Sequence, residues 1–136
     1  MPDSEINDNI GIILKSYTNI AIVGLSASSN RPSYGVANYL LTVGYNIYPV
    51  NPKYDNILNH KCYPNLLAIP DPIEIVNIFR KPNQILPVIQ ESINIKAKVI
   101  WMQSGIINMQ AADLAREAGL EVVMDRCIKI EHMYNR

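Results

Sequence analysis

The chain alternates between short continuous apolar runs and longer stretches in which apolar residues recur with helical spacing. Five runs rich in Ile and Val are expected to form strands, because β-branched residues favour extended backbone. These runs cover residues 20–25, 45–50, 73–79, 98–103 and 120–125. The periodic stretches between them predict helices over residues 32–44, 83–95, 108–119 and 127–136.

The predicted helices present apolar stripes that could pack against a sheet. Gly44 and Gly119 are suited to end two of them, and Pro87 falls in the first turn of a third. The stripes consist of Val36, Tyr39, Leu40 and Val43, of Ile85, Val88, Ile89 and Ile93, and of Met109, Ala112 and Leu114 or Ala115.

Two segments follow a different pattern. In residues 1–17, Asp3 or Ser4 is expected to cap a short helix that packs onto the domain. Its apolar face would consist of Ile6, Ile10, Ile13 and Leu14. Residues 53–72 carry several turn-forming residues and no long stripe, so we expect a short helix near residues 64–68 and otherwise a loop.

The alternation of strands and helices predicts a single α/β domain over residues 1–136, with a parallel sheet covered by helices on both faces. The expected strand order, numbered along the chain, is 3-2-1-4-5. Ligands of such folds bind outside the carboxyl ends of the strands, near the switch point between strands one and four. The candidate chemistry is therefore sought at the five strand ends.

Composition narrows the class of protein. The chain has 136 residues, of which 49% are hydrophobic, and its 12 basic residues balance 12 acidic ones. This neutrality argues against a broad surface for nucleic acid or membrane. No apolar run approaches the ~18 residues of a membrane helix, and no secretory signal is evident. Cys62 and Cys127 lie far apart, which favours reduced thiols and a cytoplasmic protein.

The first strand ends in Gly24-Leu25-Ser26, without the second and third glycines of a dinucleotide-binding fingerprint. Arg31-Pro32-Ser33 then begins a helix. A cation at a helix N-terminus opposes the helix dipole, unless an anion binds there. The sequence therefore indicates a phosphate site at this turn, and a long loop with a solvated arginine is the alternative.

The second strand ends in Asn51-Pro52-Lys53, where an NAD-binding fold would place an acidic residue for the ribose hydroxyls. An ammonium group at this position suits a phosphate monoester on the ribose. NADP carries such a group at the 2′ position and coenzyme A carries one at the 3′ position. Lys53 thus favours either of these cofactors over NAD.

The remaining strand ends add further cations and hydrogen-bonding groups. The third ends in Phe79-Arg80-Lys81, the fourth in Gln103-Ser104-Gly105 and the fifth in Met124-Asp125-Arg126-Cys127. Five basic residues would thus gather at one edge of the sheet, facing the single acid Asp125. This concentration predicts a cleft for a small, multiply phosphorylated ligand.

Five segments in order resemble the small stand-alone coenzyme A-binding proteins, which are single Rossmann-like domains akin to the CoA-binding module of succinyl-CoA synthetase alpha subunits. The resemblance covers about residues 12–135. The segments are VGLS…RPS-x-G, YPVNPK, CYP-x-L-x-x-IP, FRKP and MDRCIKIEH.

The resemblance implies a role in CoA binding for each strand end. Gly24, Leu25 and Ser26, with Arg31, Pro32 and Ser33, would surround the pyrophosphate. Asn51, Pro52 and Lys53 would contact the adenosine ribose and its 3′-phosphate, and Phe79 and Arg80 would line the adenine side. Residues 103–105, with the segment Met124, Asp125, Arg126 and Cys127, would border the pantetheine.

No catalytic or metal-binding group is expected. Cys127 near a helix start could react, but a small buried residue is the simpler interpretation. His132 is expected to be solvated or capping, His60 structural or exposed, and Trp101 part of the core. Two histidines and two distant cysteines form no ligand set of known spacing. The resemblance implies that related CoA ligases use a phosphorylated histidine on a further domain, so an independent ligase activity is not expected of these residues.

The leading hypothesis is therefore a CoA or acyl-CoA carrier, sensor or partner module. One alternative is an NADP-binding oxidoreductase domain, and another is a subunit that supplies the CoA site to a larger acyl-CoA enzyme. A homodimer is compatible with the sequence.

Overall fold

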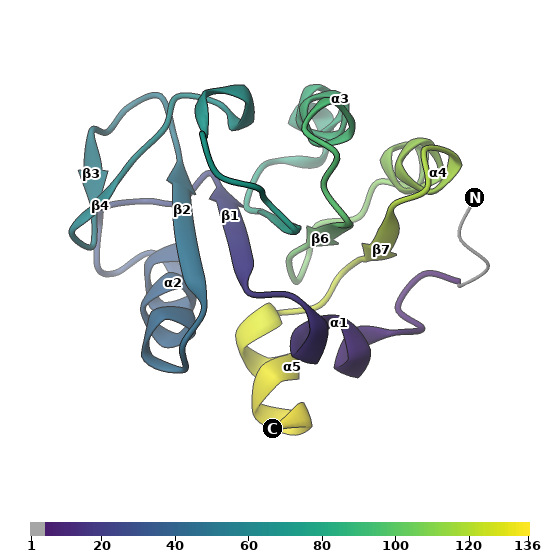
Figure 1. The fold of residues 1–136 in the computed structure, drawn as a ribbon, viewed down its shortest axis with the longest axis horizontal. Coiled ribbons are helices and arrows are strands. Elements are labelled where there is room, and N and C mark those ends of the chain that lie inside the picture. Colours follow the sequence, from purple (N-terminus) through teal and green to yellow (C-terminus); the bar gives the residue numbers. More distant parts are fainter. Residues whose placement is uncertain (1–4) are drawn as a thin grey trace.

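A computed structural model describes residues 5–136 as a five-stranded parallel sheet between two layers of helices (Figure 1). The strands are β1 (Asn19–Val23), β2 (Asn46–Val50), β5 (Ile75–Ile78), β6 (Val99–Met102) and β7 (Glu121–Val123). The helices are α1 (Ile10–Ser16), α2 (Pro32–Thr42), α3 (Leu86–Asn94), α4 (Met109–Glu117) and α5 (Ile128–Asn135). The predicted α/β class and the Rossmann-like parallel sheet are confirmed.

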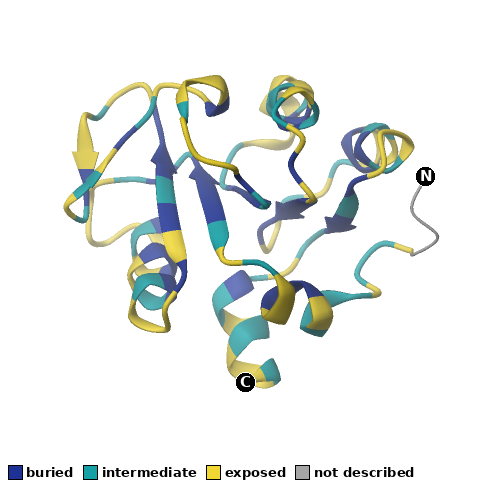
Figure 2. Cartoon of the chain, viewed as in Figure 1, coloured by how far each residue is buried: buried dark blue, intermediate teal, exposed yellow. Residues whose placement is uncertain are grey.

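Each strand contributes alternate side chains to the two helical layers. Ile20 and Ile22 of β1 pack toward α1, α2 and α5, whereas Ala21 and Val23 pack toward α3 and α4. Both faces of the sheet are therefore apolar, and the strands are buried while the outer helix surfaces are exposed (Figure 2). This two-sided burial explains why the strands read as continuous apolar runs in the sequence.

The strand order differs from the expectation. The sheet runs β2-β1-β5-β6-β7, so the strand predicted over residues 73–79 lies beside β1 and not outside β2. In chain numbering the order is 2-1-3-4-5, and the expected 3-2-1-4-5 is wrong in this respect. The switch point accordingly lies between β1 and β5.

The connection between β2 and β5 explains this order. It contains a small hairpin, β3 (Asn56–Ile57) with β4 (His60–Lys61), and a short 3-10 helix, η1 (Leu66–Ala68). After the hairpin, Tyr63 bridges the free edge of β2: its N–H donates to Pro49 and its carbonyl accepts from Asn51, each at 2.9 Å. Because Tyr63 occupies that edge, another strand cannot pair there.

Other elements confirm the expectations with local corrections. The helix near residues 64–68 is present as η1, but the hairpin was not predicted. In α2, Val36 and Leu40 are buried as expected, whereas Tyr39 is half-buried and Val43 is 37% exposed. In α4 the buried residues are Ala111, Ala112 and Ala115, and Met109 is 52% exposed. Small residues face the sheet there, and Met109 at the helix start points outward.

The N-terminal segment packs across the β7 side of the domain. Helix α1 begins only at Ile10, and the expected caps Asp3 and Ser4 lie outside the described residues. Asn7 pairs with the backbone of Met124, accepting from its N–H at 2.7 Å and donating to its carbonyl at 3.1 Å. The Asn7 N–H also donates to the Val122 carbonyl at 3.0 Å, so the segment pairs with the free edge of β7 and with the residue that follows it.

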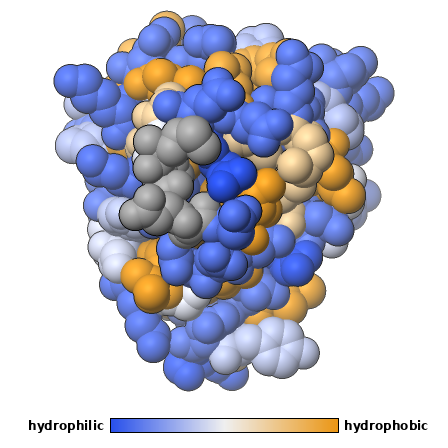
Figure 3. Space-filling view, turned by 90° about the vertical axis from the view of Figure 1, so that its right-hand side faces the viewer, coloured by the Kyte–Doolittle hydropathy of each residue, from blue (hydrophilic) through white to orange (hydrophobic). Residues whose placement is uncertain are grey.

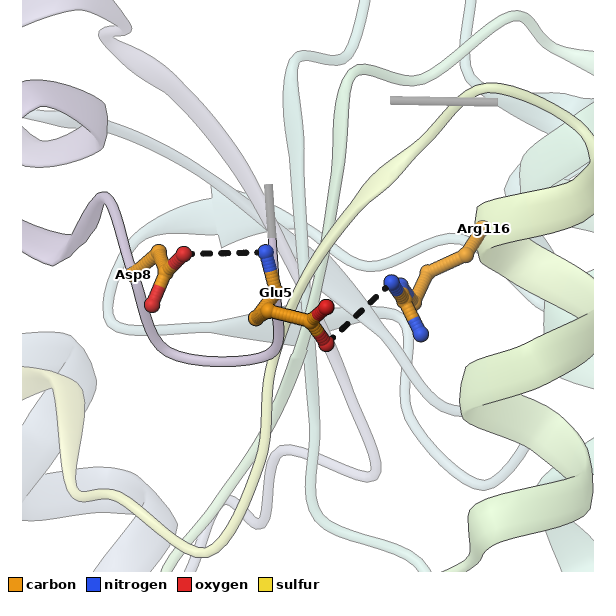
Figure 4. Close-up of polar contacts among 3 residues, drawn as sticks. All are labelled: Glu5, Asp8 and Arg116. Carbon is orange, nitrogen blue, oxygen red and sulfur yellow. Dashed lines mark hydrogen bonds and ion pairs between the residues drawn. The ribbon is translucent and has the colours of Figure 1, made fainter. Parts of the chain in front are cut away.

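An ion pair holds the start of the described chain against α4. The Glu5 carboxylate lies 3.5 Å from the Arg116 guanidinium, and the Glu5 N–H donates to the Asp8 carboxylate at 3.0 Å (Figure 4). The face seen in Figure 3 is mostly hydrophilic, with apolar side chains in smaller groups. Within residues 5–136, none of the helices has the length and hydrophobicity needed to cross a membrane.

Candidate functional site

A pocket of about 430 Å³ opens at the carboxyl ends of β1, β2 and β5, at the switch point of the sheet. We call it the central pocket. It is lined by Gly24, Ser26, Arg31, Asn51, Lys53, Tyr54, Phe79, Arg80, Lys81 and Gln84. An adjoining pocket of about 310 Å³ shares Gly24, Arg31, Phe79, Arg80 and Lys81 with it and adds Pro32, Ser33, Pro82 and Ile106.

Four cationic side chains line the central pocket and no carboxylate does: Arg31, Lys53, Arg80 and Lys81. Among the described residues, none of these four side chains forms an ion pair, although the chain as a whole is neutral. Like charges held together without counter-charges repel one another, and a bound anion would relieve that repulsion. The expected convergence of Arg31, Lys53 and Arg80 is found.

Gly24 allows the end of β1 to approach β5 closely. Its φ is +88°, and a Cβ atom there would lie 2.2 Å from the carbonyl oxygen of Phe79. Its N–H donates to Val50 at 2.8 Å, so the turn is joined to the strands on both sides. A glycine is therefore required at this position by conformation and by space.

The rest of the first turn is held by α2. The Ser33 hydroxyl is buried and accepts from the Ser26 N–H at 3.0 Å. Arg31 is the N-cap residue of α2, and Pro32 occupies the first helical position, as the sequence predicted. The backbone N–H groups at the start of α2 and the Arg31 side chain thus lie on the same side of the turn, which is an arrangement that suits phosphate. Leu25 is fully buried and lines neither pocket.

The β2 end contributes Lys53 and two residues that the sequence reasoning missed. Lys53 is exposed at the pocket, and Tyr54 follows it in the lining. Gln84, from the short 3-10 helix η2 (Pro82–Gln84), also lines the pocket. Both lie close in sequence to predicted cations, but only the fold shows that they face the pocket. Pro52 instead lines a smaller cavity of about 170 Å³ beside Arg80.

The predicted residues at the ends of β6 and β7 line neither of the two pockets. They are Gln103, Ser104, Gly105, Met124, Asp125, Arg126 and Cys127.

Several of these residues form internal hydrogen bonds instead. Gln103 is 5% exposed, and its Oε1 accepts from Asn77 Nδ2 at 3.1 Å and from the Ile128 N–H at 3.0 Å. Asp125, at a φ of +59°, accepts the Gly105 N–H at 2.7 Å. The acid that was expected to face the cations therefore stabilises a neighbouring turn, and the Arg126 guanidinium donates to the Asp125 carbonyl at 2.9 Å.

The candidate nucleophile and base are separated. Cys127 is the half-buried N-cap residue of α5, and its thiol is free. His132 is not solvated as expected: its Nδ1 lies 2.7 Å from the Tyr39 hydroxyl, and its ring packs edge-on against Tyr39 and Tyr45. It therefore joins α5 to α2. Trp101 is fully buried, as predicted.

The second cysteine and histidine lie in the β3–β4 region. Cys62 is a free, buried thiol that donates to the Asn51 carbonyl at 3.3 Å, and burial raises its pKa. His60 is half-buried with Nδ1 2.8 Å from the Leu58 carbonyl oxygen, which fits the expected structural role. Within the described part of the chain, no three potential ligands form a metal-binding group.

Comparison with known proteins points to one cofactor. A family model described as "CoA binding domain" matches residues 18–133. The uncharacterized protein YneT of Bacillus subtilis is 41% identical over 120 residues, which are 88% of this chain and 89% of YneT. The ADP-forming acetate–CoA ligase II of Archaeoglobus fulgidus is 39% identical over 70 residues, which are 50% of this chain and 10% of the ligase. A solved structure of a hypothetical protein from Pyrococcus horikoshii OT3 superimposes with a TM-score of 0.91, 42% identity and 98% coverage of both chains.

Proposed function

Since this chain belongs to the CoA-binding domain family, we propose that it binds coenzyme A or an acyl-CoA in the central pocket. The observation that carries this proposal is the group of four cations around the Gly24 turn, none of which forms an ion pair within residues 5–136. The turn itself fits the group, because Arg31, Pro32 and Ser33 at the start of α2 line the pockets beside Gly24, and a helix N-terminus favours a phosphate.

Charge supports the same ligand. Coenzyme A carries one negative charge on each phosphate of its pyrophosphate and about 1.5 to 2 on its 3′-phosphate. The total of about four matches the four cations Arg31, Lys53, Arg80 and Lys81. Coenzyme A would therefore neutralise the pocket, whereas NAD, which lacks the additional phosphate, would leave part of its charge unbalanced.

The lining residues suggest how the ligand lies. Arg31, the Gly24 turn and the N-terminus of α2 would hold the pyrophosphate, and Lys53 would bind the 3′-phosphate. Phe79 and Arg80 would border the adenine. The pantetheine would extend from the pyrophosphate through the adjoining pocket, past Ile106, toward the ends of β6 and β7. Residues 103–105 and 124–127 would border its far end, with their side chains largely committed to the fold.

The role that we propose is that of a carrier, sensor or partner module. The His132 imidazole is engaged by the Tyr39 hydroxyl, and Cys127 is the N-cap residue of α5, more than one helical turn before His132. The described structure shows no hydrogen bond between them, so we do not assign them as a nucleophile–base pair. A second role, as the CoA-site subunit of a larger acyl-CoA enzyme, is favoured by the similarity to a segment of an acetate–CoA ligase. Isolation of a stable partner chain with the tagged protein would support this second role.

Calorimetric titration with CoA, 3′-dephospho-CoA, NADP and NAD tests the proposal. CoA is expected to bind most tightly, because it carries both the pyrophosphate and the 3′-phosphate. The titration with NADP shows whether the pocket also binds a nucleotide with its ribose phosphate at the 2′ position. Binding of NADP without binding of CoA would overturn the proposal in favour of an oxidoreductase domain.

Two variants test the assignment of the cations. A hydrogen bond to a charged group contributes about 1.5–3 kcal/mol, so Lys53→Ala should weaken CoA binding about tenfold or more and leave dephospho-CoA nearly unchanged. Arg31→Ala should weaken both ligands alike. Lys61→Ala is the matched control, because Lys61 is exposed on the adjacent hairpin and does not line the pocket. Equal losses of both ligands in Lys53→Ala would show that Lys53 does not bind the 3′-phosphate.

A further inference from the structure

Asn51 lines the central pocket and takes part in five hydrogen bonds, one of which is a long bond of 3.4 Å from the Tyr54 N–H to its carbonyl. Its Nδ2 donates to the Leu25 carbonyl at 3.1 Å, and its Oδ1 accepts from the Lys53 N–H at 3.0 Å. Its own N–H donates to Tyr63 at 2.9 Å, and its carbonyl accepts from the Cys62 thiol at 3.3 Å. The residue is only 6% exposed, so its amide is directed at the protein backbone.

We propose that Asn51 is a positioning residue that fixes Lys53 relative to the Gly24 turn and so determines specificity for a ligand with a ribose 3′-phosphate. This inference rests on the proposed function, and it replaces the direct ribose contact that the sequence resemblance implies for Asn51. The side chain acts on the ligand through Lys53.

The two bonds of the side chain amide define this role. The bond from the Lys53 N–H to an oxygen two residues earlier closes an Asx-turn, which sets the direction in which the Lys53 side chain leaves the backbone. The bond to Leu25 joins that turn to the end of β1. A ligand with phosphates at both places binds best when the two binding groups are already held at the required separation.

The two ends of this connection depend on Asn51 to different degrees. The β1 turn has other supports, because the Gly24 N–H donates to Val50 and the Ser26 N–H donates to Ser33. The described structure shows no other hydrogen bond to the Lys53 N–H. Removal of the Asn51 amide should therefore disturb the 3′-phosphate site more than the pyrophosphate site.

A double-mutant cycle tests the inference with calorimetry. Asn51→Ala is expected to weaken CoA binding about fivefold to tenfold, as for one or two neutral hydrogen bonds. The loss for dephospho-CoA should be smaller, so the preference for CoA falls. In a Lys53→Ala background, Asn51→Ala should change CoA affinity less than about twofold, because the group that it positions is gone.

A conservative variant separates positioning from folding. The hydroxyl in Asn51→Ser can still accept the N–H two residues on but cannot reach Leu25. It is expected to keep more of the preference for CoA than Asn51→Ala does. Thermal unfolding of each variant identifies any that fails to fold, and Asn51→Ser then takes the place of Asn51→Ala in the cycle.

Asn108→Ala is the matched control. This variant also loses one donated bond, to Pro82 at 2.9 Å, and one accepted bond, from the Ala111 N–H at 3.0 Å, but on the other side of the site. It should keep the wild-type ratio of CoA to dephospho-CoA affinity.

Three results would overturn the inference. Equal losses of CoA and dephospho-CoA with an additive cycle would restore the direct ribose contact. A reduced ratio in Asn108→Ala would show that any loosening of the site has this effect. Failure of the unmodified protein to bind CoA at all would instead refute the proposed function, and the inference with it.

Discussion

At the scale of single residues, Gly24 shows how closely β1 and β5 approach each other at the turn where we propose that a phosphate binds. The strand ends, the turn reverses at a φ of +88°, and the Phe79 carbonyl occupies the space beside it. The closeness of β5 makes the glycine necessary. The sequence shows a glycine at the end of the first apolar run, but it does not show which strand packs against that glycine.

Gly24→Ala should both destabilise the protein and weaken ligand binding. The added Cβ would lie 2.2 Å from a backbone oxygen, in a conformation that side chains rarely adopt, so β1 and β5 must separate. A loss of about 1–3 kcal/mol in the free energy of unfolding is expected, with losses for CoA and dephospho-CoA alike.

Gly35→Ala provides the control for this prediction. Gly35 lies within α2, and nothing stands within 4 Å of a Cβ built there. Alanine favours a helix interior over glycine by up to about 1 kcal/mol, so this variant should be unchanged or more stable in urea unfolding. A Gly24→Ala protein as stable as Gly35→Ala would contradict the close approach of β1 and β5.

At the scale of elements, the β6 end joins the sheet to α5. The Gln103 side chain receives the N–H at the start of α5 and the amide of Asn77, which is fully buried in β5. The Trp101 indole N–H donates to the Arg126 carbonyl at 2.9 Å in the same connection. Polar residues at a strand end thus serve the fold here, whereas those at the ends of β1, β2 and β5 line the pocket.

Gln103→Leu is expected to reduce stability more than ligand affinity. The substitution leaves the Ile128 N–H without its side-chain acceptor and the Asn77 amide with only its 3.5 Å bond to the Trp101 carbonyl. A buried group that loses its partner costs about 1–3 kcal/mol. Urea unfolding measures this loss, with Gln110→Leu on the exposed surface of α4 as the control. A variant of normal stability that has lost CoA affinity would instead place Gln103 in contact with the ligand.

At the scale of the whole molecule, a chain with no net charge gathers positive side chains around one pocket. Four cations that form no ion pair with the described part of the chain surround one pocket, although acidic and basic residues number 12 each in the sequence. Two buried ionisable groups lie close to β2. Burial raises the pKa of the Cys62 thiol, and it also raises the pKa of Tyr45, whose hydroxyl donates to the Leu14 carbonyl at 2.6 Å.

These raised pKa values predict a loss of stability in alkali. Above about pH 9 the unfolded chain ionises its thiols and phenols, whereas the folded chain keeps Cys62 and Tyr45 protonated. The unfolded state then binds fewer protons, so the free energy of unfolding falls as the pH rises toward the folded-state pKa values.

Urea unfolding at pH 7.5 and pH 10 measures this loss. Cys62→Ser and Tyr45→Phe should each show a smaller fall between the two pH values than the unmodified protein. Tyr134→Phe, at a side chain that is 83% exposed, is the control and should show the unmodified fall. Identical falls in all four proteins would refute the contribution of the two buried groups.

The sequence by itself determined the five strands of the parallel sheet, most helix boundaries and the cations that converge, but not the β3–β4 hairpin. Apolar periodicity is a local property, and a strand buried on both sides can be recognised from its own residues. Arg31, Lys53 and Arg80 could be placed together because the carboxyl ends of parallel strands meet at one edge of the sheet, whichever strands are neighbours.

Only the tertiary structure decided the order of the strands. It also decided which polar side chains at the strand ends face the pocket and which bind the protein backbone. Tyr63 closes the edge of β2, and this long-range pairing directs β5 to the other side of β1. Asn51 and Gln103 are polar residues that directly follow a strand, as ligand-binding residues often do. Their side-chain amides nevertheless form hydrogen bonds with backbone groups of the protein. A polar side chain at a strand end can satisfy the protein or a ligand, and the choice depends on which backbone groups the fold leaves without partners.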